Sequence, residues 1–559
     1  MAEKRRVITG TNAVAVVVIS AIVAILLNVV VAGIPMPIDL TENQIYTLSQ
    51  ASKDTVKNLP EPVEVKVFIS PGLPAPLNNL PQQISDLLAD YQSASGGKLT
   101  YQIIQPAADD KDAEAAATGF GIQKVGLGSQ SEDEVSLRAV YKGVAFVMGD
   151  KTERIADLRA TGNPEYDNFE YEFTKKLMNL SNTKPRKLAF AAGFGGPAGS
   201  PQFLDAVRPA FEQLYGNLIE LSSIDLSAAD ASVPEDIDAL VLLNLEQPVS
   251  DRGKFAIDQF IQRGGSVGWY QSASGPDRQM IQQIMQQMGP NGPMPDIRKP
   301  LDHGLGELFK NYGIQLNSDL LLDRKNALAF GVIMTQNGLA RVSHPATFLM
   351  SDIDRTLPFT RDVYSIAMPG PSSVVLTPAI KDNKDVKAFE IIKTAATAVK
   401  RDSPPTSLNY QELVEPTATE IPGPFVVAAA LQGRVPSWYA NNPLPAGVTE
   451  DQLVKEQAEA RILVVGNADF LQPNPQVGFD EQLTGLGGQF FISSIEWLVQ
   501  DNALTGIRGK VVPRLIGEVT KDQQREIQII NILFVPIFFG TVGWTILAFR
   551  RRRKKTLTV

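Results

Sequence analysis

Two long apolar stretches, one towards each end of the sequence, restrict how this chain can fold more than any other feature. Residues 13–32 and residues 527–549 carry no charged side chain and few polar ones. A helix of about 20 apolar residues spans the hydrocarbon core of a bilayer. We therefore predict one transmembrane helix over residues 13–34 and a second over residues 527–549.

Basic residues flank both stretches on the side away from the middle of the chain. Cations fill residues 4–6 before the first stretch and residues 550–555 after the second. Because such flanks stay in the cytoplasm, both tips, residues 1–12 and 550–559, are expected inside a bacterial inner membrane and the body outside it. The alternative for the first stretch is a cleaved signal peptide ending in small residues at 30–32, but such a peptide has a shorter apolar core.

The body between the two stretches has the composition of a folded, acidic protein. The chain is 44% hydrophobic and 20% charged, which is typical of globular domains and excludes a disordered polymer. Its net charge is −9 although both tips are basic. The body therefore repels phosphates, and we expect no nucleic-acid partner. The absence of cysteine excludes disulfides and thiol catalysis.

Strand and helix patterns divide the body into two predicted α/β domains, residues 38–183 and 184–505, followed by a juxtamembrane segment at 506–526. In the second domain strands and helices alternate, which indicates βαβ units on a mostly parallel sheet. The first domain is expected to have strands at 63–70 and 99–104, helices at 82–91 and 166–180, and a hairpin within 140–155. The second is expected to have strands at 187–192, 218–221, 239–243, 265–269, 424–431 and 460–465, and helices at 203–214, 252–262 and 485–500.

A glycine-rich loop follows the first predicted strand of the second domain. Gly193, Gly195 and Ala198 formally match the G-x-G-x-x-A pattern of dinucleotide-binding turns, and Glu220 lies near the position of a ribose ligand. Pro197, however, removes a backbone N–H where a phosphate needs donors. The pattern therefore favours a tight strand-to-loop turn over a ligand loop, and we assign no cofactor.

Asp469 follows the predicted strand at 460–465, at the edge where open α/β sheets bind their ligands. It is either part of a ligand loop or, as we favour, a cap of the following turn. His303 is expected near a helix N-terminus and His344 in a loop.

Acidic side chains are also grouped elsewhere in the body. Asp352, Asp354 and the run at 132–134 are expected to be solvated surface charge, with divalent-ion binding as the alternative. The P-loop pattern is absent, so ATP hydrolysis by this chain is not expected. We assign no catalytic, cofactor-binding or metal-binding residue.

The second predicted span carries small residues on one face. Pro536, Gly540 and Gly543 have i, i+4 and i+7 spacing, which places them on one stripe of a helix. Small residues let a neighbouring helix approach closely in lipid. This stripe is a candidate docking surface for another membrane helix, and the alternative is that such residues are merely common in membrane spans.

Several segments, taken in order, resemble the GldG-like family of auxiliary subunits of ABC-type transport systems linked to gliding motility. The similar segments are LTENQIYTLS at 40–49, PVEVKVFIS at 62–70, YKGVAF at 141–146, FEYEFTKKL at 169–177, PEDIDAL at 234–240, IDQFIQRGG at 257–265, VGNADF at 465–470 and IRGK at 507–510. Relatives often carry a Gly-His-Gly-Glu-like segment where this chain has Gly193-Phe194-Gly195-Gly196. The resemblance therefore assigns no polar role to that loop.

The resemblance implies a non-catalytic subunit that works with a separate ATPase and a multi-span permease. It also implies a body similar to the domain of intraflagellar transport proteins and to amidotransferase-like α/β folds, here used as a binding or coupling surface. Two alternatives stay open: a structural scaffold of an envelope or motility machine, and a hydrolase of envelope polymers. The substrate and the direction of transport do not follow from the sequence.

Overall fold

The computed structural model describes residues 47–499 except 107–109, 131–134, 161–166, 182–183, 289–294, 336–337, 362 and 455. Both predicted membrane spans, the stripe of Pro536, Gly540 and Gly543, and the acidic run at 132–134 lie outside these residues. Within the described part, no helix is both long enough and apolar enough to cross a bilayer.

The first part of the body is built on a four-stranded sheet with the order β2-β1-β5-β6. Strand β1 is parallel to β2 and antiparallel to β5, and β5 forms a hairpin with β6. The predicted hairpin is thereby confirmed. The elements are α2 (Gln50–Lys57), β1 (Val63–Ile69), α3 (Leu80–Ala94), β2 (Leu99–Ile104), α4 (Lys111–Gly119), β3 (Val125–Gln130), β4 (Val135–Val140), β5 (Lys142–Met148), β6 (Lys151–Ile155) and α5 (Phe169–Leu180).

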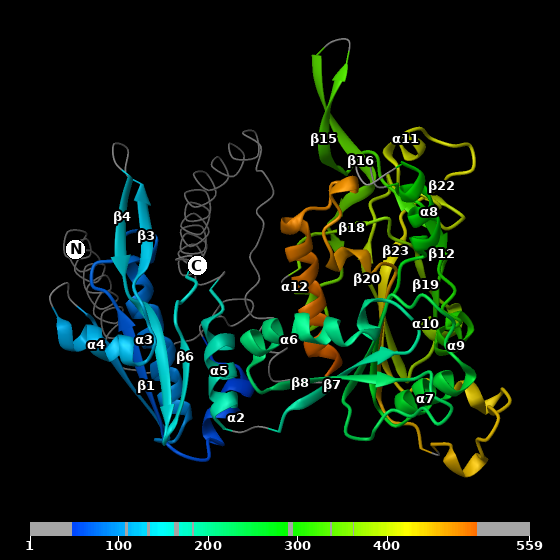
Figure 1. Cartoon of the computed structure of the whole chain (residues 1–559). Helices are drawn as coiled ribbons and strands as arrows, with labels where there is room; N and C mark the ends of the chain where they lie inside the picture. Colours follow the sequence, from blue (N-terminus) through cyan, green and yellow to red (C-terminus); the bar gives the residue numbers. More distant parts are fainter. Residues whose placement is uncertain are drawn as a thin grey trace, which may run out of the picture. The chain divides into compact units, whose positions relative to one another are not determined.

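The second part is built on an eight-stranded sheet with the order β17-β20-β23-β24-β10-β9-β7-β8. Figure 1 labels four of these strands, β7, β8, β20 and β23. The pairs from β24 to β8 are parallel, and the pairs from β17 to β24 are antiparallel. The strands are β7 (Arg186–Ala192), β8 (Ile219–Asp225), β9 (Ala239–Leu243), β10 (Ser266–Tyr270), β17 (Asp352–Ile353), β20 (Val386–Lys393), β23 (Val426–Gly433) and β24 (Ala460–Val465). The chain is thus a mixed α/β protein with several sheets.

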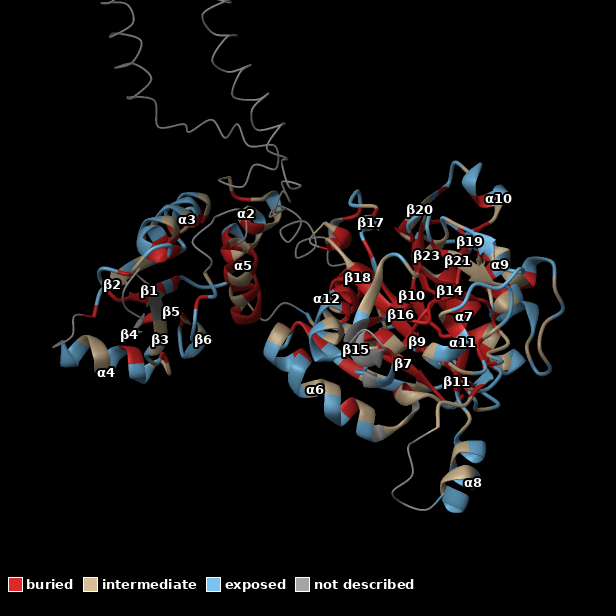
Figure 2. Cartoon of the chain, turned by 90° about the horizontal axis from the view of Figure 1, so that it is seen from above, coloured by how far each residue is buried: buried red, intermediate tan, exposed pale blue. Residues whose placement is uncertain are grey.

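Successive side chains of a strand point to opposite faces of a sheet. The strands of the large sheet bury apolar side chains on both faces, and helices cover each face. In β7, Leu188 and Phe190 face the core that contains α6 (Pro201–Tyr215) and α12 (Glu481–Leu498). Ala189 and Ala191 face the core that contains α7 (Asp251–Gln262) and α9 (Gly306–Tyr312). The central strands are accordingly buried on both faces (Figure 2).

The two late strands rejoin this sheet, as predicted. β24 lies between β10 and β23 and carries six consecutive buried residues, and β23 pairs with it in antiparallel fashion. Strands that are buried on both faces read as short apolar runs, broken in β24 only by Arg461, and this explains why both were recognisable in the sequence.

The part of the second domain for which no strands or helices were predicted forms several small sheets and short helices. Its main feature is a long hairpin of β15 (Ala327–Thr335) and β16 (Gly338–Met350), which β18 (Ile366–Pro369) extends at the base. The prediction of His344 in a loop is wrong: it lies in β16 and is buried. The remaining elements are α8 (Arg278–Met288), β11 (Ser274–Pro276), β12 (Arg298–Pro300), β13 (Ile314–Leu316), β14 (Leu320–Leu322), β19 (Val374–Leu376), α10 (Pro378–Lys381), β21 (Val399–Arg401), α11 (Tyr410–Leu413) and β22 (Ile421–Pro422).

Candidate functional site

The order β8-β7-β9 creates a topological switch point in the large sheet. From β7 the chain crosses to β8 on one side, and it then returns to β9 on the other side of β7. In open α/β sheets the crevice for ligands lies at such a point, beyond the carboxyl ends of the strands. The loop with Gly193 and Gly195 follows β7 at this point, so it occupies the standard position for a candidate site.

The glycines of this loop have backbone conformations that other residues rarely adopt. Gly193, Gly195 and Gly196 have φ angles of +98°, +69° and +80°. A Cβ atom on Gly193 would lie 2.4 Å from Asp225 Oδ1, and one on Gly196 would lie 2.3 Å from the carbonyl oxygen of Asn244. The loop therefore needs glycine both for its turn and for its close approach to the neighbouring loops.

Backbone hydrogen bonds join the glycine loop to the loop that follows β9. The carbonyl oxygen of Phe194 accepts from the N–H of Glu246 at 3.0 Å and from the N–H of Gln247 at 2.9 Å. Asn244 has a φ of +46°, and its Oδ1 accepts from the N–H of Ser272 after β10. These contacts support the predicted tight turn.

The N-terminus of the helix after the glycine loop is already capped. Ser200 precedes α6, and its Oγ accepts from the N–H of Phe203 at 3.2 Å. Pro201 occupies the first turn and has no N–H to offer. A phosphate would need the donors of this helix end, so the arrangement is unlike that of a dinucleotide-binding turn.

The prediction that Glu220 lies near a ribose position is wrong, because β8 is longer than the sequence suggested. Glu220 pairs in register with Lys187 at the amino end of β7, opposite to the glycine loop. The carboxylate at the carboxyl end of β8 is Asp225, which sequence reasoning missed. Its oxygen accepts from the N–H and Oγ of Ser227 at 2.9 and 2.6 Å, and these hydrogen bonds hold the pKa of Asp225 below its usual value.

Asp469 lies at the same edge of the sheet, after β24. Its Oδ2 accepts from Arg298 Nη2 at 2.7 Å, and Arg298 also donates to Oγ and the carbonyl oxygen of Ser274. Within the described part of the chain the side chain of Asp469 makes no hydrogen bond to the following turn, where Asn467 Oδ1 instead accepts from the N–H of Phe470 at 2.9 Å. The carboxylate thus joins β24 to β11 and β12 through a largely buried ion pair.

The loops after β10 and β24 complete a continuous polar network along this edge. Gln271 Oε1 accepts from the N–H of Leu245, and its Nε2 donates to the carbonyl oxygen of the same residue. Ser272 Oγ accepts from the N–H of Ala468 at 3.1 Å. The side chains in the loops after β9 and β10 therefore hydrogen-bond mainly to backbone groups of neighbouring loops, an arrangement suited to holding the loops in a fixed shape.

The two histidines lie outside this network. His303 Nδ1 accepts from the N–H of Leu305 just before α9, and its ring contacts Trp269 edge-on. Burial lowers the pKa of His303 to about 4, so its imidazole is neutral at neutral pH. His344 Nε2 lies 2.9 Å from the carbonyl oxygen of Leu408, and burial lowers its pKa as well. Both rings act as packed, hydrogen-bonded side chains.

No group of three or more side chains suited to a metal ion occurs within the described ranges. Of the remaining predicted site residues, Asp352 and Asp354 lie beside another edge of the large sheet, far along the strand order from β7.

Comparison with known proteins places the chain among transport proteins. Residues 185–492, more than half of the chain, match the family described as ABC-type uncharacterized transport system, and residues 42–147 match a domain of unknown function. An uncharacterized protein of Borreliella burgdorferi is 22% identical over 542 residues, which cover 92% of this chain and 93% of that protein.

Two solved structures are also similar to this chain. The N-terminal domain of mmIFT52 gives a TM-score of 0.29 at 10% identity, with 56% of this chain and 97% of that chain covered. A ThuA-like protein from Bacteroides uniformis gives a TM-score of 0.28 at 12% identity, with 57% and 94% covered. The family match confirms the resemblance seen in the sequence: the chain belongs to the family of auxiliary components of ABC-type transport systems.

Proposed function

We propose that the chain is a membrane-anchored, non-catalytic accessory subunit of an ABC transporter, which works with a separate ATPase and a multi-span permease. The observation that carries the proposal is the family match over residues 185–492, which covers nearly the whole α/β body built on the large sheet. In this proposal the body binds a partner or substrate, or transmits movement driven by nucleotide hydrolysis.

The carboxyl edge of the large sheet supports a binding or coupling role. The residues that an enzyme would direct at a substrate, such as Asp225, Gln271 and Asp469, bond instead to Ser227, Leu245 and Arg298. A site held together in this way keeps the geometry of its loops fixed.

Anchoring by the two terminal spans is the second part of the proposal. The apolar stretches at 13–34 and 527–549 and their basic flanks support two membrane helices with cytoplasmic tips and a body outside the inner membrane. The stripe of Pro536, Gly540 and Gly543 is the proposed docking surface for the permease.

Replacing Gly540 and Gly543 together with leucine is expected to keep the chain in the membrane but to lower recovery of the permease and ATPase at least about fivefold. Leucine is favourable in the bilayer, but its side chain prevents the close helix approach that small residues allow. The measurement is co-purification of the permease and the ATPase with the unchanged chain and with the variant, at matched membrane levels of the two.

The control variant carries Thr541→Leu and Thr545→Leu, which place two leucines on the opposite face of the same predicted helix. Its recovery should equal that of the unchanged chain. If the variant of Gly540 and Gly543 recovered as much permease and ATPase as the unchanged chain, the stripe would have no docking role. Failure of the unchanged chain to bring down either subunit would contradict the transporter role itself.

A further inference from the structure

The antiparallel side of the large sheet ends in a strand that is only partly covered. Strand β20 pairs along its length with β23, but on its other side β17 reaches only Ile392 and Lys393. One more backbone contact follows, from the N–H of Asp354 to the carbonyl oxygen of Ile391 at 2.8 Å. Among the described residues, no strand pairs with this side of β20 at 386–390.

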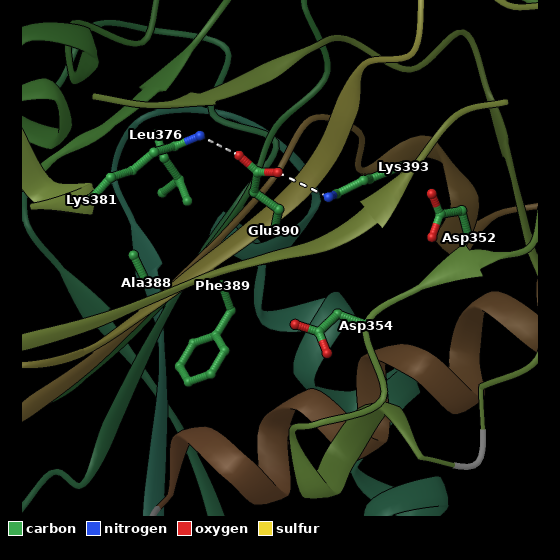
Figure 3. Close-up of a pocket in the computed structure, with 8 residues that line it drawn as sticks. All are labelled: Asp352, Asp354, Leu376, Lys381, Ala388, Phe389, Glu390 and Lys393. Carbon is green, nitrogen blue, oxygen red and sulfur yellow. Dashed lines mark hydrogen bonds and ion pairs between the residues drawn. The ribbon is translucent and has the colours of Figure 1, made fainter. Parts of the chain in front are cut away.

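A cavity of about 440 Å³ lies along this edge. It is lined from both faces of the strand: Glu390 points to one side, and Phe389 points to the other (Figure 3). The other lining residues are Asp352, Asp354, Leu376, Lys381, Ala388 and Lys393. A space that is bounded by side chains from both faces of an edge strand is the space in which a further strand would lie, since neighbouring strands are about 4.8 Å apart.

The charges around the cavity are only partly paired. Glu390 receives Lys381 Nζ at 2.5 Å and Lys393 Nζ at 2.9 Å, and these contacts hold the pKa of Glu390 below its usual value. Asp352 and Asp354 form no ion pair within 4 Å in the described part of the chain, and Asp354 Oδ1 accepts only from the N–H of Thr356. The cavity is lined by three carboxylates and two lysines, and Lys393 also lies within electrostatic reach of Asp352 and Asp354, so one net negative charge remains and favours a basic occupant.

The backbone of the edge favours an extended peptide as the occupant. An uncovered strand presents a row of N–H and C=O groups that a second chain can pair with, and recognition by added strands uses this row for affinity and side-chain pockets for specificity. The bulges at Glu390–Lys393 limit the row to residues 386–390. About five residues of extended chain fit this length, with Phe389 and Leu376 available for apolar contact.

We propose that the edge of β20 at residues 386–390 binds an extended, basic segment of a partner protein, which adds to the large sheet as a ninth strand. The segment pairs its backbone with β20 and places a lysine or arginine beside Asp352 and Asp354. This binding site is separate from the carboxyl edge of the parallel strands, and it does not depend on which protein supplies the segment or on the transporter role.

The test uses the full-length chain in detergent and fluorescent, end-blocked octapeptides of alternating valine and threonine. Two of them carry a pair of lysines, at either the N- or the C-terminal end, because the direction of the added strand is open. Fluorescence anisotropy should give saturable binding of one lysine peptide, with a Kd of about 10–300 μM, which is in the range of weak peptide recognition. The peptide with glutamates in place of lysines should bind at least about tenfold more weakly.

Two further comparisons separate strand addition from simple charge attraction. Two N-methylated versions of the lysine peptide are compared, one methylated at its odd-numbered residues and one at its even-numbered residues. Only one of these sets of N–H groups faces β20, so one version should bind about tenfold or more weakly and the other less than about twofold more weakly. The double variant Asp352→Asn and Asp354→Asn should bind about threefold to tenfold more weakly. Asparagine keeps the oxygen that accepts from Thr356, and unchanged circular dichroism checks the fold.

Glu307→Gln on α9 is the matched control, since its carboxylate is exposed and its distance to Lys310 is 3.8 Å. It should bind the lysine peptide as the unchanged chain does. No saturable binding of either lysine peptide up to about 1 mM would overturn the proposal. So would equal loss with both methylated sets, or binding that the Asp352 and Asp354 variant leaves unchanged.

Discussion

Replacement of Asp258 with alanine is expected to lower the free energy of unfolding of the large α/β body by about 3–5 kcal/mol. Asp258 lies on α7 and is fully buried. Its carboxylate accepts from Tyr312 Oη at 2.7 Å, from Ser437 Oγ at 2.7 Å and from the N–H of Trp438 at 2.8 Å. Alanine leaves the buried Tyr312 hydroxyl and the two half-buried donors of Ser437 and Trp438 without an acceptor, and a buried donor without one costs about 1–3 kcal/mol.

Urea unfolding followed by tryptophan fluorescence is the measurement. The four tryptophans are Trp269, Trp438, Trp497 and Trp544, so the signal within residues 47–499 comes from the large body alone. Asp251→Ala is the control on the same helix: the exposed side chain of Asp251 pairs with Lys254 at 3.3 Å, and its backbone oxygen, which alanine keeps, accepts from Tyr439 Oη, so a loss of unfolding free energy below about 1 kcal/mol is expected. Equal losses for the two variants would show that the buried network contributes nothing measurable.

The same carboxylate predicts a pH dependence. Burial raises the pKa of Asp258 above its ordinary value, and the hydrogen bonds from Trp438, Ser437, Tyr312 and Gln259 offset this only in part. The contribution of the protonated carboxyl to stability is therefore complete below the unfolded-state pKa and is lost as pH rises through the folded-state pKa. Relative to Asp258→Asn, which does not titrate, the unchanged chain should lose unfolding free energy as pH rises from about 4.

Gly196→Ala adds a single methyl group and is expected to lower the free energy of unfolding by about 3–5 kcal/mol, as much as Asp258→Ala. Gly196 has φ +80° and ψ 175°, a region open almost only to glycine. Its Cβ would also meet the backbone oxygens of Asn244 and Leu243 at 2.3 and 3.1 Å, and backbone cannot rotate away as a side chain can. The two costs add because one is conformational and the other is steric.

Gly195→Ala separates these two costs. Gly195 also has a positive φ, but its Cβ would meet only the side chain of Glu246, at 3.1 Å. In this variant the free energy of unfolding is expected to fall by about 1–2 kcal/mol, from the backbone conformation alone. The same urea titration measures both variants. If Gly196→Ala were no worse than Gly195→Ala, the close contact between the loops after β7 and β9 would not hold in solution.

The strands of the parallel part of the sheet were the easiest elements to predict. β9 and β24 have the bounds that the sequence suggested, because β9 is a continuous apolar run between two polar residues and β24 is apolar except for Arg461. β8 was predicted too short, since IELSSID alternates apolar and polar residues at the sheet edge and its second half resembles a loop. That error hid Asp225, which a full-length strand would have placed beside the glycine loop.

Other features depend on contacts that sequence patterns do not encode. The ion pair between Arg298 and Asp469 joins residues that are 171 positions apart. The hairpin of β15 and β16 places His344 in a buried strand, although a histidine before Pro345 suggests a loop. The edge of β20 is open because β17 is only two residues long. The alternation of apolar and polar residues in the sequence does not reveal this length.

The central claim, that this chain is an accessory subunit of an ABC transporter, is tested most directly by purifying the full-length chain from its native membrane in mild detergent. Mass spectrometry then identifies and quantifies the proteins that elute with it. The account predicts an ATPase subunit and a multi-span permease in fixed proportion to the chain. Recovery of the chain without either subunit, from a membrane whose other complexes stay intact in the same detergent, would contradict it.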